Sequence, residues 1–212
     1  MAETWVFVLA RDPASAKTRL APVLPPAARA DLAAAMLDDV IAATRVVPFA
    51  KRMIVTESAA VRKVARADRI ETLDVPATGT NGAARAAAGA APDGVRALFL
   101  VADIPLVSAA DLEQLLDVAA PIVIAPDRHG RGTNALVLSP ASIIAPAFGR
   151  DSFRAHAERA ANAGAKARVV RRRGLATDID DPEDLRVAMR SRSLGPRTRE
   201  LLATPAFRRA LD

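Results

Sequence analysis

The sequence predicts an α/β protein with a mostly parallel sheet that helices cover on both faces. Short apolar runs alternate with longer segments of helical periodicity along the whole chain. Several helical segments begin with a capping residue or a proline, and the length of 212 residues suits one domain. Strands that alternate with helices in this way form βαβ units, which build such a sheet.

Seven elements are expected in the first half of the chain. The long helix begins after Pro25 and places Leu32, Met36 and Val40 on one face, and Ser58 is positioned to cap the next helix. The run ALFLVAD at 97–103 has the composition of a strand buried on both faces. The strands are expected at 5–10, 52–56, 70–75 and 97–103, and the helices at 25–44, 58–67 and 81–91.

The second half is expected to continue the same alternation. Its helices start at a Ser-x-x-Asp cap at Ser108, at residue 151, and at Asp181 followed by Pro182, and Gly164 ends the middle one. The expected helices are 108–119, 151–164 and 181–190, and the expected strands are 121–126, 134–139, 167–170 and 175–179. These elements complete a domain over residues 1–192.

A short basic helical tail is expected at residues 193–212, after a Gly-Pro break. It would pack either on the domain or on a second subunit, so a homodimer is possible. The N-terminus lacks the features of a signal peptide, and no apolar run is long enough to span a bilayer. We therefore expect a cytoplasmic protein with no membrane partner.

Composition excludes several kinds of site. The chain has no cysteine, so it has no disulfide, thiolate nucleophile or Cys-based zinc site, and its two histidines are too few for a His-rich metal centre. The net charge of +6 suggests a polyanionic partner, either nucleic acid or phosphorylated small molecules. Aromatic residues make up 3% of the chain and tyrosine is absent, which argues against binding of single-stranded nucleic acid by stacking.

Ligands bind at the carboxyl ends of the strands in such a sheet, and three segments there carry suitable groups. The loop RDPASAKTRL at 11–20 offers Lys17 and Arg19 to phosphates, although it is not a Walker loop. Asp103 ends the most apolar strand, and Asp178 and Asp180 would point to the same side of the expected strand at 175–179. Carboxylates together with substrate phosphates are what Mg²⁺ prefers. The alternative is that these residues form solvated turns and helix caps.

A fourth candidate combines the loop PDRHGRGTN at 126–134 with FGRDSFRAH at 148–156. Ser152 or Asp151 would cap a helix whose N-terminus attracts anions, and Gly149 permits close backbone approach. The run G-R-G-T-N-A is not a dinucleotide fingerprint, because an apolar strand follows it instead of a helix. Without further support, His129 is interpreted as a loop-surface residue and His156 as a helix-face residue. Together the four segments supply basic loops, carboxylates at strand ends and a helix N-terminus. These are the groups that metal-assisted transfer of a phosphoryl-type group requires.

The order of these segments resembles one family. The stretches AKTRLAP (16–22), ADIPL (102–106), APDRHGRGTNALVLSP (125–140), FGRDSFRAHAERA (148–160) and DIDDPEDL (178–185) are similar to those of the 2-phospho-L-lactate guanylyltransferases. That family acts in the biosynthesis of the deazaflavin coenzyme F-420. The resemblance covers most of residues 5–190, and the block 125–160 is its specific part. It implies a Rossmann-like nucleotidyltransferase of the kind that also transfers guanine nucleotides to molybdopterin.

The resemblance implies a substrate pair and a role for each matching residue. GTP and a small phosphorylated acid would react, pyrophosphate would leave, and the product would pass to the next transferase of the pathway. The acid would be 2-phospho-L-lactate, phosphoenolpyruvate or 3-phospho-D-glycerate. The implied roles are Mg²⁺ ligands for Asp103, Asp178 and Asp180, acid binding for Thr133, Gly149 and Ser152, GTP phosphate binding for Lys17 and Arg19, and nucleotide binding for Asn81.

Catalysis would need no general base, because the phosphate of the acid is already an anion when it attacks the α-phosphorus of GTP. The loop at 126–134 would cradle the acid, with backbone N–H groups at its glycines reaching the anion. Arg128 and Arg131 would supply charge, either as direct ligands or at long range. This chain departs from the family at two places, with Arg11 in place of the usual lysine and Thr80 in place of the leucine in a Gly-Leu-Asn element.

Three rival readings stay open from the sequence. A transferase of the same fold would act on a sugar phosphate or molybdopterin and would ignore phospho-acids. A nucleic-acid-binding module would use Arg171–Arg173 and the tail, and salt-dependent binding to duplex DNA would identify it. A non-catalytic protein of this fold would bind GTP without releasing pyrophosphate.

Overall fold

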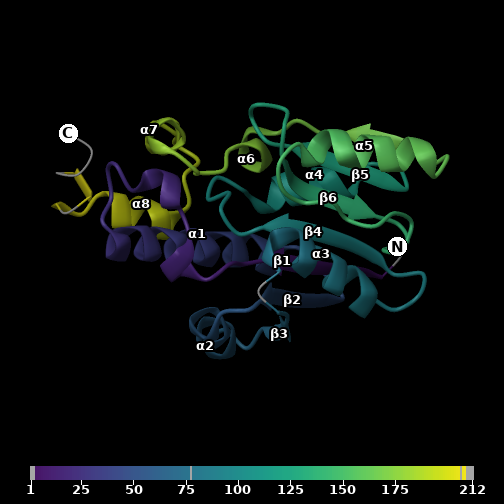
Figure 1. The fold of residues 1–212 in the computed structure, drawn as a ribbon, viewed down its shortest axis with the longest axis horizontal. Helices are drawn as coiled ribbons and strands as arrows, with labels where there is room; N and C mark the ends of the chain where they lie inside the picture. The colour runs from purple at the N-terminus through teal and green to yellow at the C-terminus, as the bar shows by residue number, and fades with distance from the viewer. Residues whose placement is uncertain (1–2, 77, 206, 209–212) are drawn as a thin grey trace.

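The computed structural model describes residues 3–76, 78–205 and 207–208, and its strands there form one mixed sheet (Figure 1). The order of the strands across the sheet is β3-β2-β1-β4-β6-β5-β7. Neighbouring strands are parallel except where β6 pairs with β4 and β5. The strands are β1 Thr4–Leu9, β2 Lys51–Thr56, β3 Glu71–Asp74, β4 Arg96–Val101, β5 Ile122–Pro126, β6 Thr133–Leu138 and β7 Ala167–Val169.

Three of the helices begin at capping residues that the sequence predicts. The Ser58 hydroxyl accepts a hydrogen bond from the Val61 N–H, and Ser108 with Asp111 forms the predicted capping box. Asp181 caps its helix with Pro182 at the first turn, also as predicted. The helices are α1 Pro26–Val46, α2 Ala59–Ala67, α3 Gly79–Ala90, α4 Ala109–Leu116, α5 Ser152–Asn162, α6 Arg173–Ala176, α7 Pro182–Met189 and α8 Pro196–Leu202, with 3-10 turns η1 Pro13–Ser15 and η2 Thr18–Leu20.

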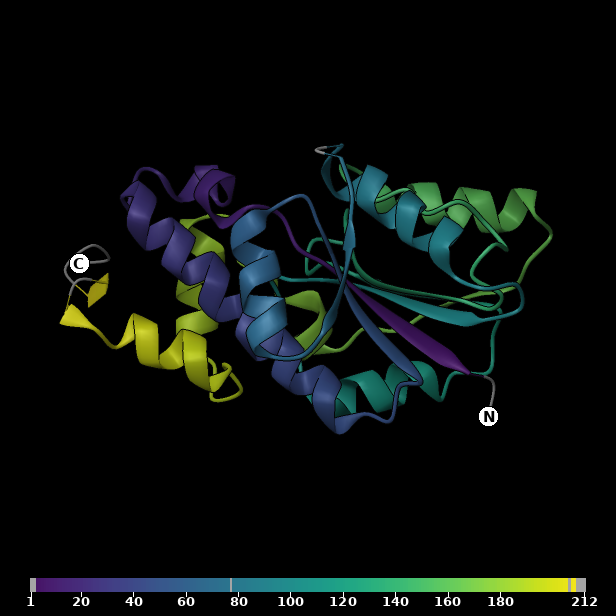
Figure 2. The ribbon, with the colours of Figure 1, turned by 90° about the horizontal axis from the view of Figure 1, so that it is seen from below.

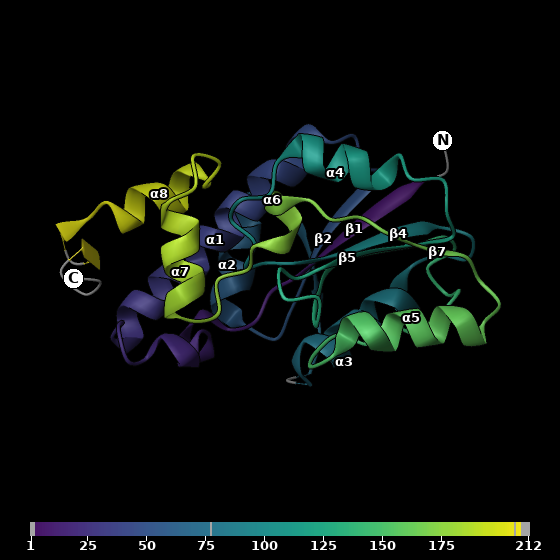
Figure 3. The same ribbon diagram turned by 90° about the horizontal axis from the view of Figure 1, so that it is seen from above.

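Helices cover both faces of the sheet, as the sequence predicts (Figures 2 and 3). Helices α3 and α5 lie on one face, where alanines of α3 pack against Phe7, Phe99 and Leu136 of the strands. Helices α1, α2, α4 and α6 supply buried side chains to the core on the opposite face. The prediction of a mostly parallel sheet between two helical layers is therefore confirmed.

The reversed strand β6 decides where the polar groups meet. It runs antiparallel to β4, with Leu100 near the end of β4 opposite Ala135 near the start of β6. The amino end of β6 thus lies at the same edge of the sheet as the carboxyl ends of β1 and β4. Thr133 and Asn134, which begin β6, are brought to the edge at which ligands bind in such sheets.

The prediction of a strand at 175–179 is wrong. The segment instead contains the short helix α6 followed by an irregular stretch that leads to α7. The Leu175 and Ala176 N–H groups both donate to the Arg172 carbonyl, so the chain closes a local turn in place of pairing with β7. The Ile179 N–H donates to the Asp103 carbonyl, which ties this stretch to the end of β4.

The tail packs on the domain, which is one of the two arrangements expected for it. The Asp39 carboxylate of α1 accepts the N–H groups of Arg197 and Thr198 at the start of α8. Leu202 and Phe207 are buried against residues of α1 and α7 in a third core cluster. Residues 206 and 209–212 of the tail lie outside the described part. A helix both long and apolar enough to cross a membrane does not occur within the described ranges.

Candidate active site

A buried lysine organises the loop that follows β1. The chain passes through η1 and η2, and Lys17 between them adopts a left-handed conformation with φ of 56°. A residue other than glycine in this conformation is uncommon. The Lys17 side chain is 6% exposed, and its Nζ lies 2.6 Å from Asp103 Oδ2 and 2.8 Å from Asp180 Oδ1. Lys17 therefore bridges the end of β4 and the stretch before α7.

The two ion pairs keep Lys17 charged. Burial by itself would lower the pKa of Lys17, but the carboxylates of Asp103 and Asp180 outweigh it and raise the pKa above its ordinary value. Burial likewise opposes ionisation of Asp180, and the Lys17 ammonium overcomes it and holds the pKa of that carboxyl below its usual range. The loop of 11–20 thus carries a fixed positive charge at the carboxyl edge of the sheet.

Asp178 lies in the same group, although the predicted strand that would have aligned it with Asp180 does not form. Burial, followed by the nearby carboxylates of Asp103 and Asp180, raises the pKa of Asp178 to about 7. Its Oδ1 accepts a hydrogen bond of 3.2 Å from Asn134 Nδ2, which also donates to the Leu175 carbonyl. Lys17, Asp103, Asp178 and Asp180 are called the lysine cluster below.

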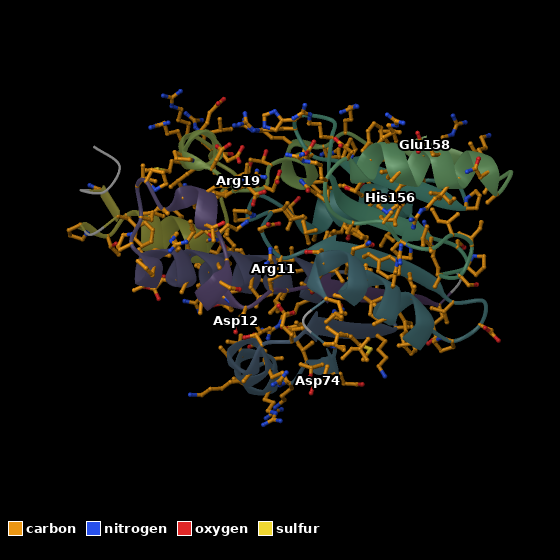
Figure 4. All side chains as sticks on the ribbon, viewed as in Figure 1. Arg11, Asp12, Arg19, Asp74, His156 and Glu158 are labelled. Atoms are coloured by element: carbon orange, nitrogen blue, oxygen red, sulfur yellow. The ribbon has the colours of Figure 1, made fainter. Side chains whose placement is uncertain are left out.

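A pocket of about 210 Å³ opens beside the lysine cluster. Its walls come from the loop after β1, from α1, from Thr80 of α3, and from Asp103 and Asp180. Asn81 follows Thr80, and its Oδ1 is buried without a hydrogen-bond partner. Arg19 is 71% exposed, and its Nη1 lies 3.9 Å from Asp180 Oδ2, so it remains free to move. Figure 4 labels Arg11, Asp12 and Arg19, which belong to the segment that follows β1.

The aspartates of the lysine cluster suit a hard cation only in part. Within residues 3–76, 78–205 and 207–208, no group of three or more His, Cys, Asp and Glu side chains is arranged to hold a metal ion. An all-protein cage is not what Mg²⁺ requires, because it binds through one or two carboxylates together with water and substrate phosphates. Burial and the neighbouring carboxylates raise the pKa of Asp178, and a bound cation would favour its ionised form. The donor set therefore fits Mg²⁺ that arrives with a phosphate ligand.

The glycine amides of the loop between β5 and β6 bond within the loop itself, contrary to the expectation that they reach an anion. Asp127 Oδ1 and Oδ2 accept the N–H groups of Arg131 and Gly132, each at 2.8 Å. The Gly130 N–H donates to the Asp127 carbonyl. A Cβ on Gly132 would lie 2.8 Å from Asp127 Oδ2, so glycine is needed there for the turn itself. The glycines make the hairpin compact and leave these amides engaged.

Arg128 is also engaged within the protein. Its Nε donates to Asp184 Oδ1 at 2.7 Å, and its Nη1 lies 3.5 Å from Glu183 Oε1. Asp184 in turn accepts the N–H groups of Asp180 and Asp181 through Oδ2. Arg128 therefore connects the hairpin to the start of α7 and steadies the backbone that carries Asp180. Its Nη2 is buried without a hydrogen-bond partner, so a role as a ligand of the acid stays a prediction.

The start of α5 lies beside the start of β6. Gly149 has φ of 126°, a conformation that favours glycine, and Ser152 is buried as the first helical residue. The expected side-chain cap is wrong, because Asp151 adopts a left-handed conformation and makes no capping hydrogen bond. The Phe153 N–H donates to the Arg131 carbonyl and joins this turn to the hairpin.

His156 joins these elements from within the core. It is fully buried, its Nδ1 lies 3.0 Å from Thr133 Oγ1, and its Nε2 accepts the Ala147 N–H at 2.9 Å. Thr133, Ser152 and His156 are called the threonine cluster below. His129 is exposed on the hairpin, as interpreted from the sequence. The sequence placed His156 on a helix face but did not predict that it is buried. Its position four residues after Ser152, on the same face of the helix, was the signal that could have indicated this.

Asn134 is a second residue whose role the sequence did not reveal. Neighbouring side chains of β6 reach opposite helical layers, since Thr133 bonds His156 of α5 and Asn134 bonds the Leu175 carbonyl of α6 and Asp178. The lysine cluster and the threonine cluster are thereby attached to consecutive residues of one strand. The signal in the sequence was a side-chain amide at the start of a predicted strand, where polar groups from neighbouring strand ends can meet it.

Comparison with known proteins identifies the family. Residues 5–205 match the family described as CofC-like guanylyl transferases. The chain belongs to this family. It is 38% identical over 175 residues to the phosphoenolpyruvate guanylyltransferase of Rubrobacter xylanophilus, covering 80% of this chain and 85% of that protein. It is 34% identical over 200 residues to the 2-phospho-L-lactate guanylyltransferase of Methanoculleus marisnigri, covering 94% and 88%.

Solved structures confirm the fold of this guanylyl transferase family member. One match is the crystal structure of a protein from Desulfovibrio desulfuricans G20 that is described as a nucleotide-diphospho-sugar transferase. The TM-score is 0.80 and the identity 17%, over 100% of this chain and 99% of that one. Rv0371c of Mycobacterium tuberculosis, crystallised with manganese, matches with a TM-score of 0.56 and 18% identity, over 88% and 97%. The predicted Rossmann-like nucleotidyltransferase architecture is thus confirmed.

Proposed function

We propose that the protein transfers GMP from GTP to a small phosphorylated acid and releases pyrophosphate. The observation that carries this proposal is the Lys17 ammonium, held between Asp103 and Asp180 at the wall of the pocket. A permanently charged lysine beside carboxylates at the carboxyl edge of the sheet is suited to a nucleotide's phosphates and their counterion. Membership of the CofC-like family supports the same reaction.

Each predicted site residue has a place in this reaction. Lys17 and Arg19 bind the phosphates of GTP, and Asn81 offers its unpartnered Oδ1 to the nucleotide. Thr133, Gly149 and Ser152 bind the carboxylate or phosphate of the acid at the junction of β6 and α5. The Asn134–Asp178 hydrogen bond links the strand that carries Thr133 to the aspartates beside Lys17.

The chemical step needs no proton carrier. A phosphate oxygen of the acid forms a bond to the α-phosphorus of GTP, and the bond from that phosphorus to the α,β-bridging oxygen breaks, so that pyrophosphate leaves. Lys17 and Arg19 neutralise charge that develops on the leaving group. His156 is neutral and buried, and His129 lies on the hairpin surface, so neither is placed to transfer a proton.

Magnesium is the metal we assign to this site. Asp103, Asp178 and Asp180 would hold it together with substrate phosphates, and the ion would neutralise the attacking and leaving oxygens. The raised pKa of Asp178 is consistent with carboxylates that await a cation. The manganese in the Rv0371c crystal supports a divalent metal at a site of this fold.

The acceptor is the least determined part of the reaction. Relatives with 36 to 38% identity are named phosphoenolpyruvate guanylyltransferases, and one with 34% identity acts on 2-phospho-L-lactate by its name. We therefore place phosphoenolpyruvate first, followed by 2-phospho-L-lactate and 3-phospho-D-glycerate. The product would enter coenzyme F-420 biosynthesis in the cytoplasm and pass to the next transferase.

The test is pyrophosphate release with Mg²⁺ and GTP, measured against each of the three acids separately. ATP in place of GTP controls for the base, and a sugar phosphate in place of the acid controls for the acceptor. Release with GTP and one of the acids is the expected result. Folded protein that releases pyrophosphate with the sugar phosphate, or with no acceptor at all, would contradict the proposal.

A further inference from the structure

His156 is a completely buried imidazole with both ring nitrogens in hydrogen bonds. Figure 4 shows it and Glu158 on α5, where Glu158 is largely exposed and His156 has no exposed surface. Nδ1 lies 3.0 Å from the Thr133 hydroxyl of β6, and Nε2 lies 2.9 Å from the backbone nitrogen of Ala147. The ring also packs edge-on against Phe148, with 5.3 Å between ring centroids.

The backbone partner decides which nitrogen carries the proton. A backbone N–H can only donate, so Nε2 must be the unprotonated nitrogen that accepts from Ala147. A neutral imidazole then has its hydrogen on Nδ1 and donates it to Thr133 Oγ1. Burial, followed by the charge of Arg159, lowers the pKa of His156 to about 4, so the ring is neutral at physiological pH.

The tautomer of His156 orients the hydroxyl of Thr133. Because Oγ1 accepts the Nδ1–H, the hydroxyl hydrogen of Thr133 is left to donate to another group. An oxygen of a carboxylate or phosphate is an acceptor without a hydrogen, so such a hydroxyl matches it. With the opposite tautomer, the Thr133 hydroxyl would donate into the core and would present only lone pairs to an anion.

We propose that His156 is a positioning residue for the acid, which orients the Thr133 hydroxyl as a donor and holds the 147–149 turn in place through Ala147. This rests on the proposed role of Thr133, Gly149 and Ser152 in binding the acid. His156 bonds Thr133 directly and reaches the turn of Gly149 through Ala147, and Ser152 lies four residues before it on the same helix. His156 acts through these groups and does not touch the substrate.

The first test reads the tautomer in the unaltered protein. The chain has two histidines, so a His129→Gln variant assigns their signals in a long-range ¹H–¹⁵N spectrum. We expect His156 to be neutral at pH 7, with Nδ1 protonated and Nε2 unprotonated. A spectrum with the proton on Nε2, or an imidazolium, would overturn the proposal without any assay of activity.

The second test separates positioning from packing. His156→Phe keeps the ring and removes both hydrogen bonds, whereas His156→Asn keeps a donor near the position of Nδ1. We expect His156→Phe to raise the KM for the acid by about 10- to 30-fold, with the KM for GTP unchanged and kcat within about 3-fold. His156→Asn should restore most of the affinity for the acid. Parallel losses for both substrates would mean that His156 is merely structural.

A double-mutant cycle supplies the control. Thr133→Val removes the hydroxyl, so adding His156→Phe to it should raise the KM for the acid little further, whereas independent residues would give additive effects. If His156→Phe does not fold, the cycle is run with His156→Leu and Thr133→Val, because leucine also removes both hydrogen bonds of the ring. Wild-type turnover with unchanged acid affinity in His156→Phe overturns this proposal alone. Silence of the wild type with every acid overturns the proposed function as well.

Discussion

The lysine cluster and the threonine cluster are attached to the consecutive residues Asn134 and Thr133 of β6, yet they are built in opposite ways. The lysine cluster is held by charge, since the Lys17 ammonium lies between Asp103 and Asp180, and burial together with these carboxylates raises the pKa of Asp178. The threonine cluster is neutral, and hydrogen bonds through the buried His156 determine its geometry. The cluster that we propose for phosphates and a cation is thus arranged by charge, whereas the one that we propose for the acid is oriented by hydrogen bonds.

The two designs respond differently to change. Replacing a charged residue of the lysine cluster leaves an opposite charge uncompensated. We expect this to destabilise the transition state of the proposed nucleotidyl transfer. Replacing a neutral group in the threonine cluster costs a hydrogen bond and changes the affinity for one substrate. The following predictions use this difference.

Asp103→Asn should have the largest effect. It removes one carboxylate that faces Lys17 and that we assign to the metal, so kcat/KM should fall by about 10³-fold with the fold intact. Turnover with Mg²⁺ and circular dichroism are the measurements. Asp93→Asn, at an exposed loop position, is the matched control and should be silent. Near-normal turnover in Asp103→Asn would contradict the assignment.

Lys17→Gln should follow, with a loss on the order of 10²-fold in kcat/KM. The amide cannot neutralise the phosphates, and Asp103 and Asp180 then repel one another. Lys63→Gln, on the exposed surface of α2, controls for a change of net charge. An effect confined to stability, with turnover preserved, would make Lys17 a structural residue.

The pH dependence of stability should reveal the neutral design of the threonine cluster. The folded-state pKa of His156, about 4, lies below the usual value of 6.5, so the unfolded chain binds more protons and stability falls as pH drops from 6.5 to 4. The full difference is on the order of 3 kcal/mol. Urea unfolding of the wild type and of His156→Phe across this range measures it, because the other groups titrate in both proteins. Identical slopes would show that His156 is not buried as a neutral ring.

Arg128→Gln should have the smallest effect on activity. Its partners are Asp184 and Glu183, so the loss should be about 1–2 kcal/mol of stability, with the KM for the acid within about 3-fold of wild type. Arg131→Gln, an exposed position in the same hairpin, is the comparison. A KM for the acid raised more than about 10-fold in Arg128→Gln alone would restore Arg128 as an anion ligand.

Local signals in the sequence predict most of the elements of this fold. The apolar runs of β1, β2, β4 and β5 and the caps at Ser58, Ser108 and Asp181 lie where expected, because each depends on neighbouring residues. The strand expected at 175–179 fails because a turn closed on Arg172 competes with pairing at the edge of the sheet. The periodicity of five residues is too short a pattern to distinguish a strand from a helical turn.

The sequence by itself named Lys17, Asp103 and Asp180 as candidate ligands, and it correctly placed Lys17 and Asp103 after the strands β1 and β4. Only the tertiary structure decided that Lys17 pairs with partners 86 and 163 residues away, that Arg128 is taken up by Asp184, and that His156 lies under Thr133. These contacts depend on the order of the strands and on the reversed direction of β6. That order follows from how both helical layers bury their apolar faces together, which no local pattern records.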